Sequence, residues 1–262
     1  LDLEDSVAPA RKEEARILVR NALRQLDFRG AERMVRINQG PMGLEDLDAV
    51  IPQRVNLVLM PKCELAEEVV SVADRISKIR AGEGINGKVW LMPIIDPAKG
   101  VQNAYSSAVS HPDVVAMAIG LEDLTADLGV PRSKEGAESF YARTRIINAS
   151  KAAGIQPIDS VFSDVGDMEG LAETVRMSKS LGFEGMGCIH PRQIPVIKNG
   201  FLPEKSEIDK SCKIVLAYEE AESKGLGVVA LGSKMIDPPV VARAMKTISL
   251  AVVSGLISPE WR

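Results

Sequence analysis

Charged and polar side chains recur directly after short apolar runs over the first 190 residues of this 262-residue chain. The residues at these places are Glu4, Asp5, Arg36, Asn38, Lys62, Glu64, Asp96, Glu122, Asp123, Asp164 and His190. Two converging carboxylates, completed by water and substrate oxygens, are the usual protein site for Mg²⁺. The planar fork of an arginine binds a carboxylate through two hydrogen bonds. The pattern therefore indicates a site for a hard metal ion and a carboxylate.

Asp96 and Asp123 are the candidate metal ligands. Each lies just beyond an apolar run, and the two runs are expected to be neighbouring strands, so the carboxylates could converge. The alternative is helix capping, because Asp96-Pro97 and Asp123 both precede expected helices, where an aspartate accepts hydrogen bonds from backbone amides.

Arg36 is the candidate for binding a substrate carboxylate, and its alternative is an ion pair with Glu4 or Glu64. His190, which precedes Pro191, would bind phosphate or act as an acid, although a hydrogen-bonded structural histidine is the simpler interpretation. His111 is interpreted as a loop residue.

These residues need elements that bring them together, and seven short apolar runs predict strands. They lie at 1–5, 33–38, 57–62, 88–95, 114–120, 157–162 and 186–190. Helical stretches separate them, with apolar residues recurring every three or four positions, for example Ala15, Leu18, Val19, Ala22, Leu23 and Leu26. Further helices are expected around 65–79, 101–108, 140–153 and 171–178.

Apolar strands alternating with helices predict a parallel sheet buried on both faces. An eighth strand before Leu1 would close a (β/α)₈ TIM barrel, and an open doubly wound sheet is the alternative. In a barrel the chemistry gathers at the carboxyl ends of the strands, where the charged residues above are expected. No glycine fingerprint of a dinucleotide-binding or P-loop fold is present.

The pattern changes beyond residue 200. A helix is expected from Ser206 with Asp209 completing a capping box, followed by a glycine-rich connector at 225–232 and a last helix carrying Val240, Ala244 and Ile248. The division is therefore 1–200 for the barrel and 201–262 for a helical extension or lid, which is too short to bury a core alone.

Composition excludes several classes of protein. The net charge is −4 and aromatic residues make up 4% of the chain, which disfavours nucleic-acid binding. No apolar run is long enough for a membrane helix. Cys63, Cys188 and Cys212 are predicted to be reduced thiols in the core of a cytoplasmic protein.

Six ordered segments carry a resemblance to the citrate lyase beta subunit family, whose relatives include malyl-CoA and citramalyl-CoA lyases with a Mg-dependent aldolase barrel. The segments are Leu1-Asp-Leu-Glu-Asp-Ser-Val7, Val35-Arg-Ile-Asn38, Leu59-Met-Pro-Lys62, Gly120-Leu-Glu-Asp-Leu-Thr-Ala-Asp-Leu-Gly129, Gly182-Phe-Glu-Gly185 with Ile189-His-Pro-Arg-Gln-Ile194, and Gly232-Ser-Lys-Met-Ile-Asp237. The resemblance implies that a strand similar to Leu-Phe-Val-Pro-Gly precedes Leu1.

The resemblance also implies an activity: Mg²⁺-dependent cleavage of a 3-hydroxyacyl thioester, carried on coenzyme A or an acyl carrier protein, into an acetyl thioester and a 2-oxo acid such as oxaloacetate. Arg36 would bind the oxo acid, Asp96 and Asp123 would hold Mg²⁺ with Asp96 also facing the substrate, and Asp237 would act on the thioester carbon. Asp96 replaces the family's usual Glu and is one methylene shorter. The resemblance further implies a homotrimer or hexamer, with Asp237 completing a neighbouring subunit's site.

Alternatives to a citryl or citramalyl thioester lyase are a malyl-CoA lyase and a thioester-binding or acyl-carrier-binding subunit that has lost catalysis. Mg²⁺-dependent release of an oxo acid separates these functions. A structural reading of Asp237 also stays open, because an aspartate before Pro238-Pro239 is a common helix start.

Overall fold

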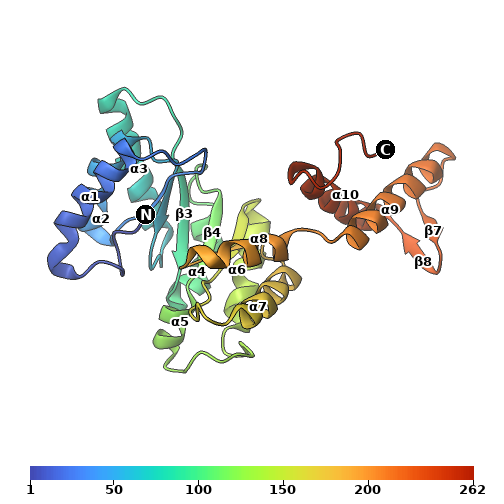
Figure 1. Ribbon diagram of the computed structural model, residues 1–262. Coiled ribbons are helices and arrows are strands. Elements are labelled where there is room, and N and C mark those ends of the chain that lie inside the picture. Colours follow the sequence, from blue (N-terminus) through green and yellow to red (C-terminus); the bar gives the residue numbers. More distant parts are fainter. The chain divides into compact units, whose positions relative to one another are not determined.

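Six parallel strands form one curled sheet in the computed structural model, which describes residues 1–262 (Figure 1). Their order along the sheet follows the sequence: β1 (Met34–Arg36), β2 (Leu57–Met60), β3 (Trp90–Ile95), β4 (Ala116–Ile119), β5 (Gln156–Asp159) and β6 (Gly185–Met186). Parallel neighbours need a crossover between them, and helices supply it here. The predicted parallel α/β architecture is confirmed as a curled half-barrel.

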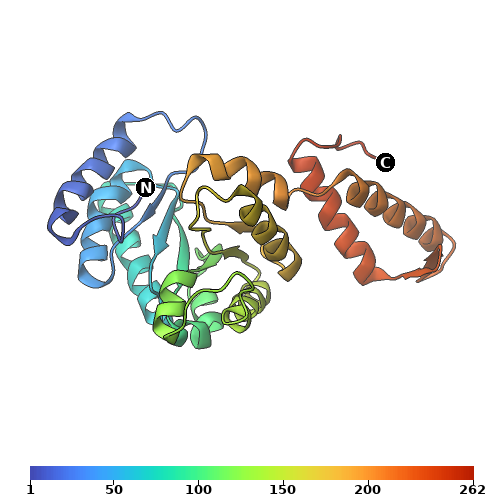
Figure 2. The same ribbon diagram turned by 60° about the horizontal axis from the view of Figure 1, so that its bottom comes forward.

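The chain divides into two compact units, each described by itself. Leu1–Asp167 with Met177–Pro191 forms the first, and Met168–Arg176 with Arg192–Arg262 forms the second. The first unit contains the sheet and the helices around it (Figure 2). These helices are α1 (Lys12–Gln25), α2 (Gly40–Val50), α3 (Ala66–Glu83), α4 (Ala98–Ala108), α5 (Leu121–Leu128) and α6 (Phe140–Ala153), with 3₁₀ turns at Pro9–Arg11 and Ile51–Gln53; α7 (Met168–Leu181) is shared between the units.

The apolar strands are buried, as their composition predicts. All four residues of β4 are buried, and Leu57, Met92, Ala116 and Ala118 form one cluster of buried side chains across neighbouring strands. A strand covered on both faces has no solvent-facing side, so its sequence is a continuous apolar run. This burial explains why the sequence located the strands correctly.

The first and last predicted strands are shorter than expected. The opening segment joins β1 through a single parallel bridge between Asp2 and Arg36, with Leu1 and Leu3 bonded to the β1 backbone. The last strand covers only Gly185–Met186, so the expected strand at 186–190 is wrong beyond Met186. Pro191 begins a 3₁₀ turn soon after, and the residue preceding a proline has restricted backbone freedom.

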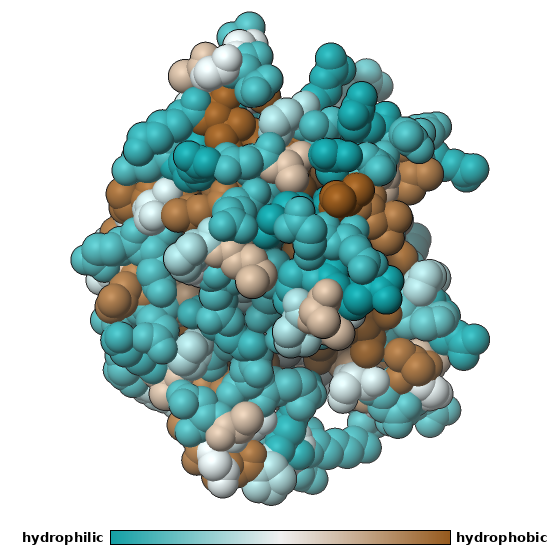
Figure 3. Space-filling view, turned by 90° about the vertical axis from the view of Figure 1, so that its left-hand side faces the viewer, coloured by the Kyte–Doolittle hydropathy of each residue, from teal (hydrophilic) through white to brown (hydrophobic).

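Helix α1 buries a narrower stripe than its periodicity predicts. Val19 and Leu23 are buried, whereas Leu18 is 71% exposed and Leu26 is 61% exposed. The side of the first unit that carries α1 and α2 is predominantly hydrophilic, with apolar side chains in scattered areas (Figure 3). Helix α2, which begins at Gly40 after β1 ends at Arg36, is not among the expected helices. The helix expected beside Asp123 is α5, but it begins at Leu121, so Asp123 lies inside its first turn rather than before it.

The second unit pairs α9 (Lys205–Ser223) with α10 (Pro238–Val253) and also contains the 3₁₀ turn Pro191–Gln193 in part and α8 (Ile194–Phe201). Its buried cluster is formed by Ile214, Val215, Ile236, Ala244 and Ile248. The expected glycine-rich connector is instead an antiparallel hairpin of β7 (Val229–Leu231) and β8 (Lys234–Ile236). Gly232, with φ of 63°, supplies the left-handed turn between the strands.

The capping box of α9 also differs from the prediction. The N-cap is Glu204 and the third helical residue is Glu207, so the box lies two residues earlier than the expected Ser206 and Asp209 pair. The Glu207 carboxylate accepts a 2.8 Å hydrogen bond from the Glu204 backbone N–H. None of the helices combines the length and apolarity needed to cross a bilayer.

Candidate functional site

The charged residues predicted at strand ends meet at one edge of the sheet. Arg36 is the last residue of β1, Lys62 follows β2, Asp96 follows β3, and Asp123 lies in the first turn of α5 after β4. Because all these strands are parallel, their carboxyl ends share an edge. The prediction that these side chains gather at one end is confirmed by their contacts.

Arg36 is surrounded by carboxylates from the opening segment. Its Nε and Nη2 bind the two oxygens of Asp2 at 2.7 and 2.5 Å, and its Nη1 lies 2.9 Å from Glu4 Oε2. The hydrogen bond to Asp2 raises the pKa of the guanidinium. Although burial opposes it, hydrogen bonding to Arg36 holds the pKa of Asp2 well below its usual value. The ion pair with Glu4 is present, whereas Glu64 binds Lys99 instead.

Lys62 connects the two halves of this cluster. Its Nζ lies 3.0 Å from Glu4, 3.3 Å from Asp5 and 3.6 Å from Asp123. Its backbone has φ of 50°, a left-handed conformation that is uncommon for a non-glycine residue. Burial disfavours the charged ammonium, but Glu4, Asp123 and Asp5 outweigh it and raise the pKa of Lys62.

Asp96 is a buried carboxylate with only 4% of the residue exposed. Its Oδ2 accepts a hydrogen bond of 2.8 Å from the backbone N–H of Lys62. Its Oδ1 lies so close to Gly120 that a Cβ there would be 1.7 Å away. Burial, with further contributions from the charges of Asp123 and Glu4, raises the pKa of Asp96 to about 6. A buried carboxylate beside other carboxylates is stabilised by any cation that binds between them.

Asp123 is more exposed, with 47% of its side chain accessible. Gly120 is the N-cap of α5 and Pro97 is the N-cap of α4, so neither Asp96 nor Asp123 is an N-cap residue. The first backbone N–H groups of α5 and α4 instead bind Ser160 and Asp127. The capping alternative is therefore wrong for both Asp96 and Asp123. Their carboxylates are available for another role.

Asp96 and Asp123 line a hollow of about 330 Å³ at this edge of the sheet. Its other lining residues are Gln39, Lys62, Glu64, Glu68, Pro97 and Asp127. No group of three or more His, Cys, Asp or Glu side chains is arranged to hold a metal ion. Two carboxylates with room for water and substrate oxygens fit Mg²⁺, which keeps much of its hydration shell, better than a metal needing a full protein cage.

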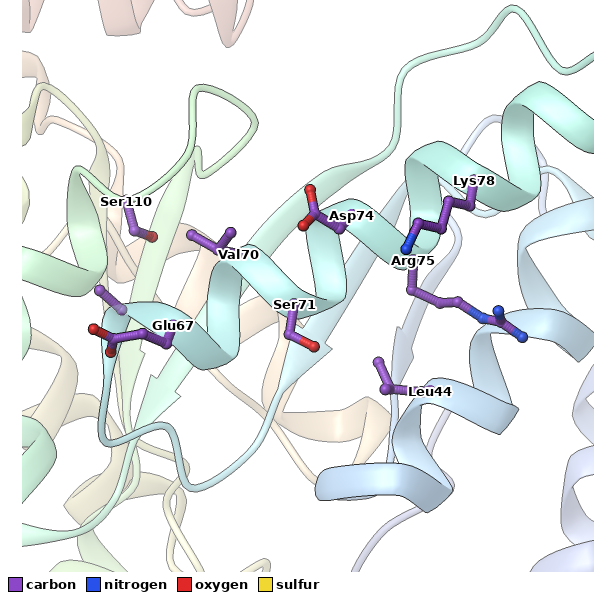
Figure 4. A pocket seen from close by; sticks show the side chains of 9 residues that line it. Leu44, Glu67, Val70, Ser71, Asp74, Arg75, Lys78 and Ser110 are labelled. Carbon is purple, nitrogen blue, oxygen red and sulfur yellow. The ribbon is translucent and has the colours of Figure 1, made fainter.

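A second hollow of about 680 Å³ lies along α3 and is lined by Leu44 of α2 and by Ser110 (Figure 4). It contains two acidic side chains, Glu67 and Asp74, and two basic ones, Arg75 and Lys78. Arg75 is already paired with Asp48. These opposite charges give this hollow no net charge, unlike the hollow at the strand ends.

The remaining candidates are Asp237, the two histidines and the cysteines. Asp237 belongs to the second unit and is the N-cap of α10, accepting a 3.2 Å hydrogen bond from the Val240 N–H. His190 is exposed, and His111 accepts a hydrogen bond from the Asp113 N–H, as a loop residue would. Cys63 is buried and burial raises its pKa to about 12, but Cys188 is exposed, so the prediction of a core thiol is wrong there.

Sequence reasoning missed two contributors to the site. The sequence predicts Asp2 only as part of a strand, although its pairing with β1 places it directly beside Arg36. Ser160 follows β5 and accepts a 3.1 Å hydrogen bond from the Leu121 N–H at the start of α5. The charge of Asp2 was a visible signal, whereas nothing in the sequence distinguishes Ser160 from other serines.

A curled parallel sheet with a carboxylate-rich hollow at its carboxyl edge is the architecture of TIM-barrel-like α/β proteins, which place their active sites at that edge. The chain belongs to the HpcH/HpaI aldolase/citrate lyase family, which it matches over residues 1–191.

Named relatives cover almost the whole chain. It is 37% identical over 258 residues to the citrate lyase subunit beta of Escherichia coli K12, covering 97% of this chain and 85% of the relative. It is 33% identical to the human mitochondrial citramalyl-CoA lyase, and the match covers 96% of this chain and 77% of the relative. The crystal structure of protein CitE from Mycobacterium tuberculosis, in complex with magnesium, acetoacetate and coenzyme A, superposes on this chain with a TM-score of 0.79. The two are 31% identical, and the match covers 96% of this chain and 88% of CitE.

Proposed function

We propose that this protein is a Mg²⁺-dependent carbon–carbon lyase that cleaves a 3-hydroxyacyl thioester into an acetyl thioester and a 2-oxo acid. The thioester is citryl or citramalyl, carried on coenzyme A or an acyl carrier protein, and oxaloacetate is the product from the citryl group. The full-length relatedness to citrate lyase beta subunits and citramalyl-CoA lyases supports this reaction. The observation that carries it is that buried Asp96 and Asp123 line one hollow at the edge of the sheet where β1 ends in Arg36.

Asp96 and Asp123 would hold Mg²⁺, whose contribution is Lewis-acid stabilisation of the oxygen that becomes the ketone. Asp96 has the shorter side chain where the family usually has Glu. Its burial beside Asp123 in a hollow lined by carboxylates supports its role as a ligand. Asp96 also lines the hollow that would receive the substrate.

Arg36 would bind the carboxylate of the oxo acid. Asp2 occupies Nε and one N–H of Nη2, and Glu4 lies at Nη1, so the guanidinium still has N–H groups for a substrate. Asp2 and Glu4 also fix its orientation. A fixed fork would align the bond to be broken with the carbonyl groups on either side.

The reaction balances with these groups. The hydroxyl gives its proton to water in the open hollow, its oxygen becomes the ketone of the oxo acid, and the electron pair of the broken C–C bond moves into the thioester enolate. The enolate carbon then takes a proton, and Asp237 is the proposed acid. Asp237 would come from a neighbouring subunit of a homotrimer or hexamer, with the segment 201–262 acting as a lid over the barrel of 1–200.

The complete (β/α)₈ barrel is part of this proposal, with its remaining strand supplied before Leu1. The opening segment supports it, because the segment already continues the parallel pairing beyond β1. A cytoplasmic location stays a prediction. A malyl-CoA lyase activity and a non-catalytic thioester-binding role are the alternative functions.

The test is an assay of purified protein with citryl-, citramalyl- and malyl-CoA, with and without Mg²⁺. We expect Mg²⁺-dependent release of oxaloacetate or pyruvate from the first two. Glyoxylate release from malyl-CoA alone would favour the malyl-type alternative. Binding of the thioesters without any oxo-acid release would identify a non-catalytic subunit.

A further inference from the structure

Lys62 has contacts that the proposed reaction does not use. Its ammonium reaches three carboxylates, Glu4, Asp5 and Asp123, the last of which is a proposed metal ligand. The Nζ lies at 3.0 Å from Glu4, within hydrogen-bond range, but at 3.6 Å from Asp123. The ammonium is therefore held mainly by Glu4 and only secondarily attracts Asp123.

Asp123 does not need Lys62 to stay in place, because its helix is fixed on both sides. The Leu121 N–H binds the Ser160 hydroxyl, and Arg132 joins Glu122 to the Val161 carbonyl oxygen at 2.6 and 3.1 Å. On the other side, Asp127 accepts a 2.8 Å hydrogen bond from the Ala98 N–H. Removing the lysine side chain should leave the first turn of α5 where it is.

The position of Lys62 is also independent of Asp123. Its left-handed backbone directs its N–H onto the Asp96 carboxylate at 2.8 Å, and Glu4 and Asp5 hold its ammonium. The ammonium can therefore leave Asp123 without a rearrangement of the backbone. A positive charge that contacts a metal ligand, yet supports neither the ligand nor its helix, opposes the binding of a second cation.

We propose that Lys62 is an internal competitor of the metal ion, whose ammonium neutralises Asp123 in the metal-free protein and withdraws onto Glu4 and Asp5 when a divalent cation binds. This inference rests on the proposed metal site at Asp96 and Asp123. Glu4 binds both Lys62 and Arg36, through Oε1 and Oε2 at 3.0 and 2.9 Å. Metal occupancy is thereby linked to the residue proposed to bind the oxo acid.

The test is calorimetric titration of Mg²⁺ into the metal-free protein without substrate. Lys62→Met retains the length of the side chain and removes its charge. Removal of a unit charge a few ångströms from a solvent-exposed cation site should tighten Mg²⁺ binding about tenfold. Lys62→Arg, which keeps the charge, should bind within about twofold of the parent.

Two controls separate this effect from a general change in charge. Lys151→Met removes an ammonium that pairs with Glu184, and neither of these residues lines the hollow, so it should leave the affinity within about twofold. In an Asp123→Asn background, Lys62→Met should lose most of its effect, because the shared carboxylate is gone.

The outcomes distinguish the two proposals. Unchanged or weaker Mg²⁺ binding in Lys62→Met, with Asp123→Asn still impairing binding, overturns the competitor role and leaves the metal site intact. If Asp123→Asn and Asp96→Ala both bind Mg²⁺ as the parent does, the metal site itself is wrong. Equal tightening in Lys62→Met and Lys151→Met would show a long-range charge effect and would also overturn the competitor role.

Discussion

Asp2 binds Arg36 side-on, with Nε–Oδ1 and Nη2–Oδ2 distances of 2.7 and 2.5 Å, and this pair joins the opening segment to the end of β1. The two side chains are each 28% exposed, so the pair lies at the surface of the site rather than in the core. The arginine is thus both a link in the structure and a cation that can still reach a substrate. Its two roles predict different effects of mutation.

Arg36→Lys keeps the positive charge but removes the fork. We expect a loss of transition-state stabilisation of about 2–4 kcal/mol, because a bidentate charged pair is broken on one side. The measurement is kcat/KM alongside thermal unfolding. Turnover near the parental rate with lower thermal stability would show that Arg36 serves Asp2 and Glu4 alone.

Asp123→Asn removes one carboxylate from the proposed metal site. The side chain is about half exposed, so the fold should persist while Mg²⁺ binding is weakened and metal-dependent activity is lost. Asp96→Ala should weaken Mg²⁺ binding as well. Calorimetry decides, and the circular dichroism spectrum of each variant is the control for folding.

Gly120→Ala tests how closely Asp96 must approach α5. The new Cβ would lie 1.7 Å from Asp96 Oδ1 and 2.9 Å from its Cγ, so the carboxylate must move. We expect weaker Mg²⁺ binding and a loss of about 1–3 kcal/mol in the free energy of unfolding, as for overpacking elsewhere. Gly82→Ala, inside α3 with no atom within 4 Å of the added Cβ, is the matched control and should not be destabilising.

The raised pKa of Asp96 predicts opposite pH dependences for stability and metal binding. Its pKa is about 6 in the metal-free fold against a reference value of 3.8, so folding favours the protonated carboxyl. Its contribution to stability is therefore fully present below 3.8 and is lost as the pH rises through about 6. Mg²⁺ affinity should instead fall as the pH drops through about 6, because the ligand is the carboxylate.

Chemical denaturation of the metal-free protein at several pH values measures the first dependence, and calorimetry measures the second. Asp96→Asn cannot titrate, so the corresponding part of the stability change should disappear in that variant. A parent and a variant with the same stability profile across this range would contradict the assignment to Asp96.

Subunit mixing tests the proposed role of Asp237. Asp237→Asn removes the acid but keeps an oxygen that can accept the Val240 N–H, so α10 should retain its cap. Mixed with Arg36→Ala under conditions of subunit exchange, it should recover activity that neither variant has alone. Full activity of Asp237→Asn by itself would show that Asp237 only caps α10. Proven subunit exchange without recovered activity would show either that Asp237 and Arg36 act in the same chain's site or that Asp237 has no role in the reaction.

The sequence by itself determined the strands and many of the helices. A strand buried on both faces is a continuous apolar run, which is visible in the sequence alone. The helix expected at 140–153 is α6, Phe140–Ala153. Strands β2 to β4 fall within expected apolar runs, and β5 begins one residue before its expected run. The same logic placed Arg36, Lys62, Asp96 and Asp123 at strand ends. Parallel pairing then required those ends to share an edge.

Only the tertiary structure decided which polar groups meet. Asp2 rather than Glu64 binds the fork of Arg36, and Asp96 accepts the Lys62 N–H instead of capping α4. These choices depend on side-chain directions and on the left-handed backbone of Lys62, which periodicity does not encode. The β7–β8 hairpin was hidden for a related reason: its short strands are partly exposed, so they lack the continuous apolar run that revealed the buried strands.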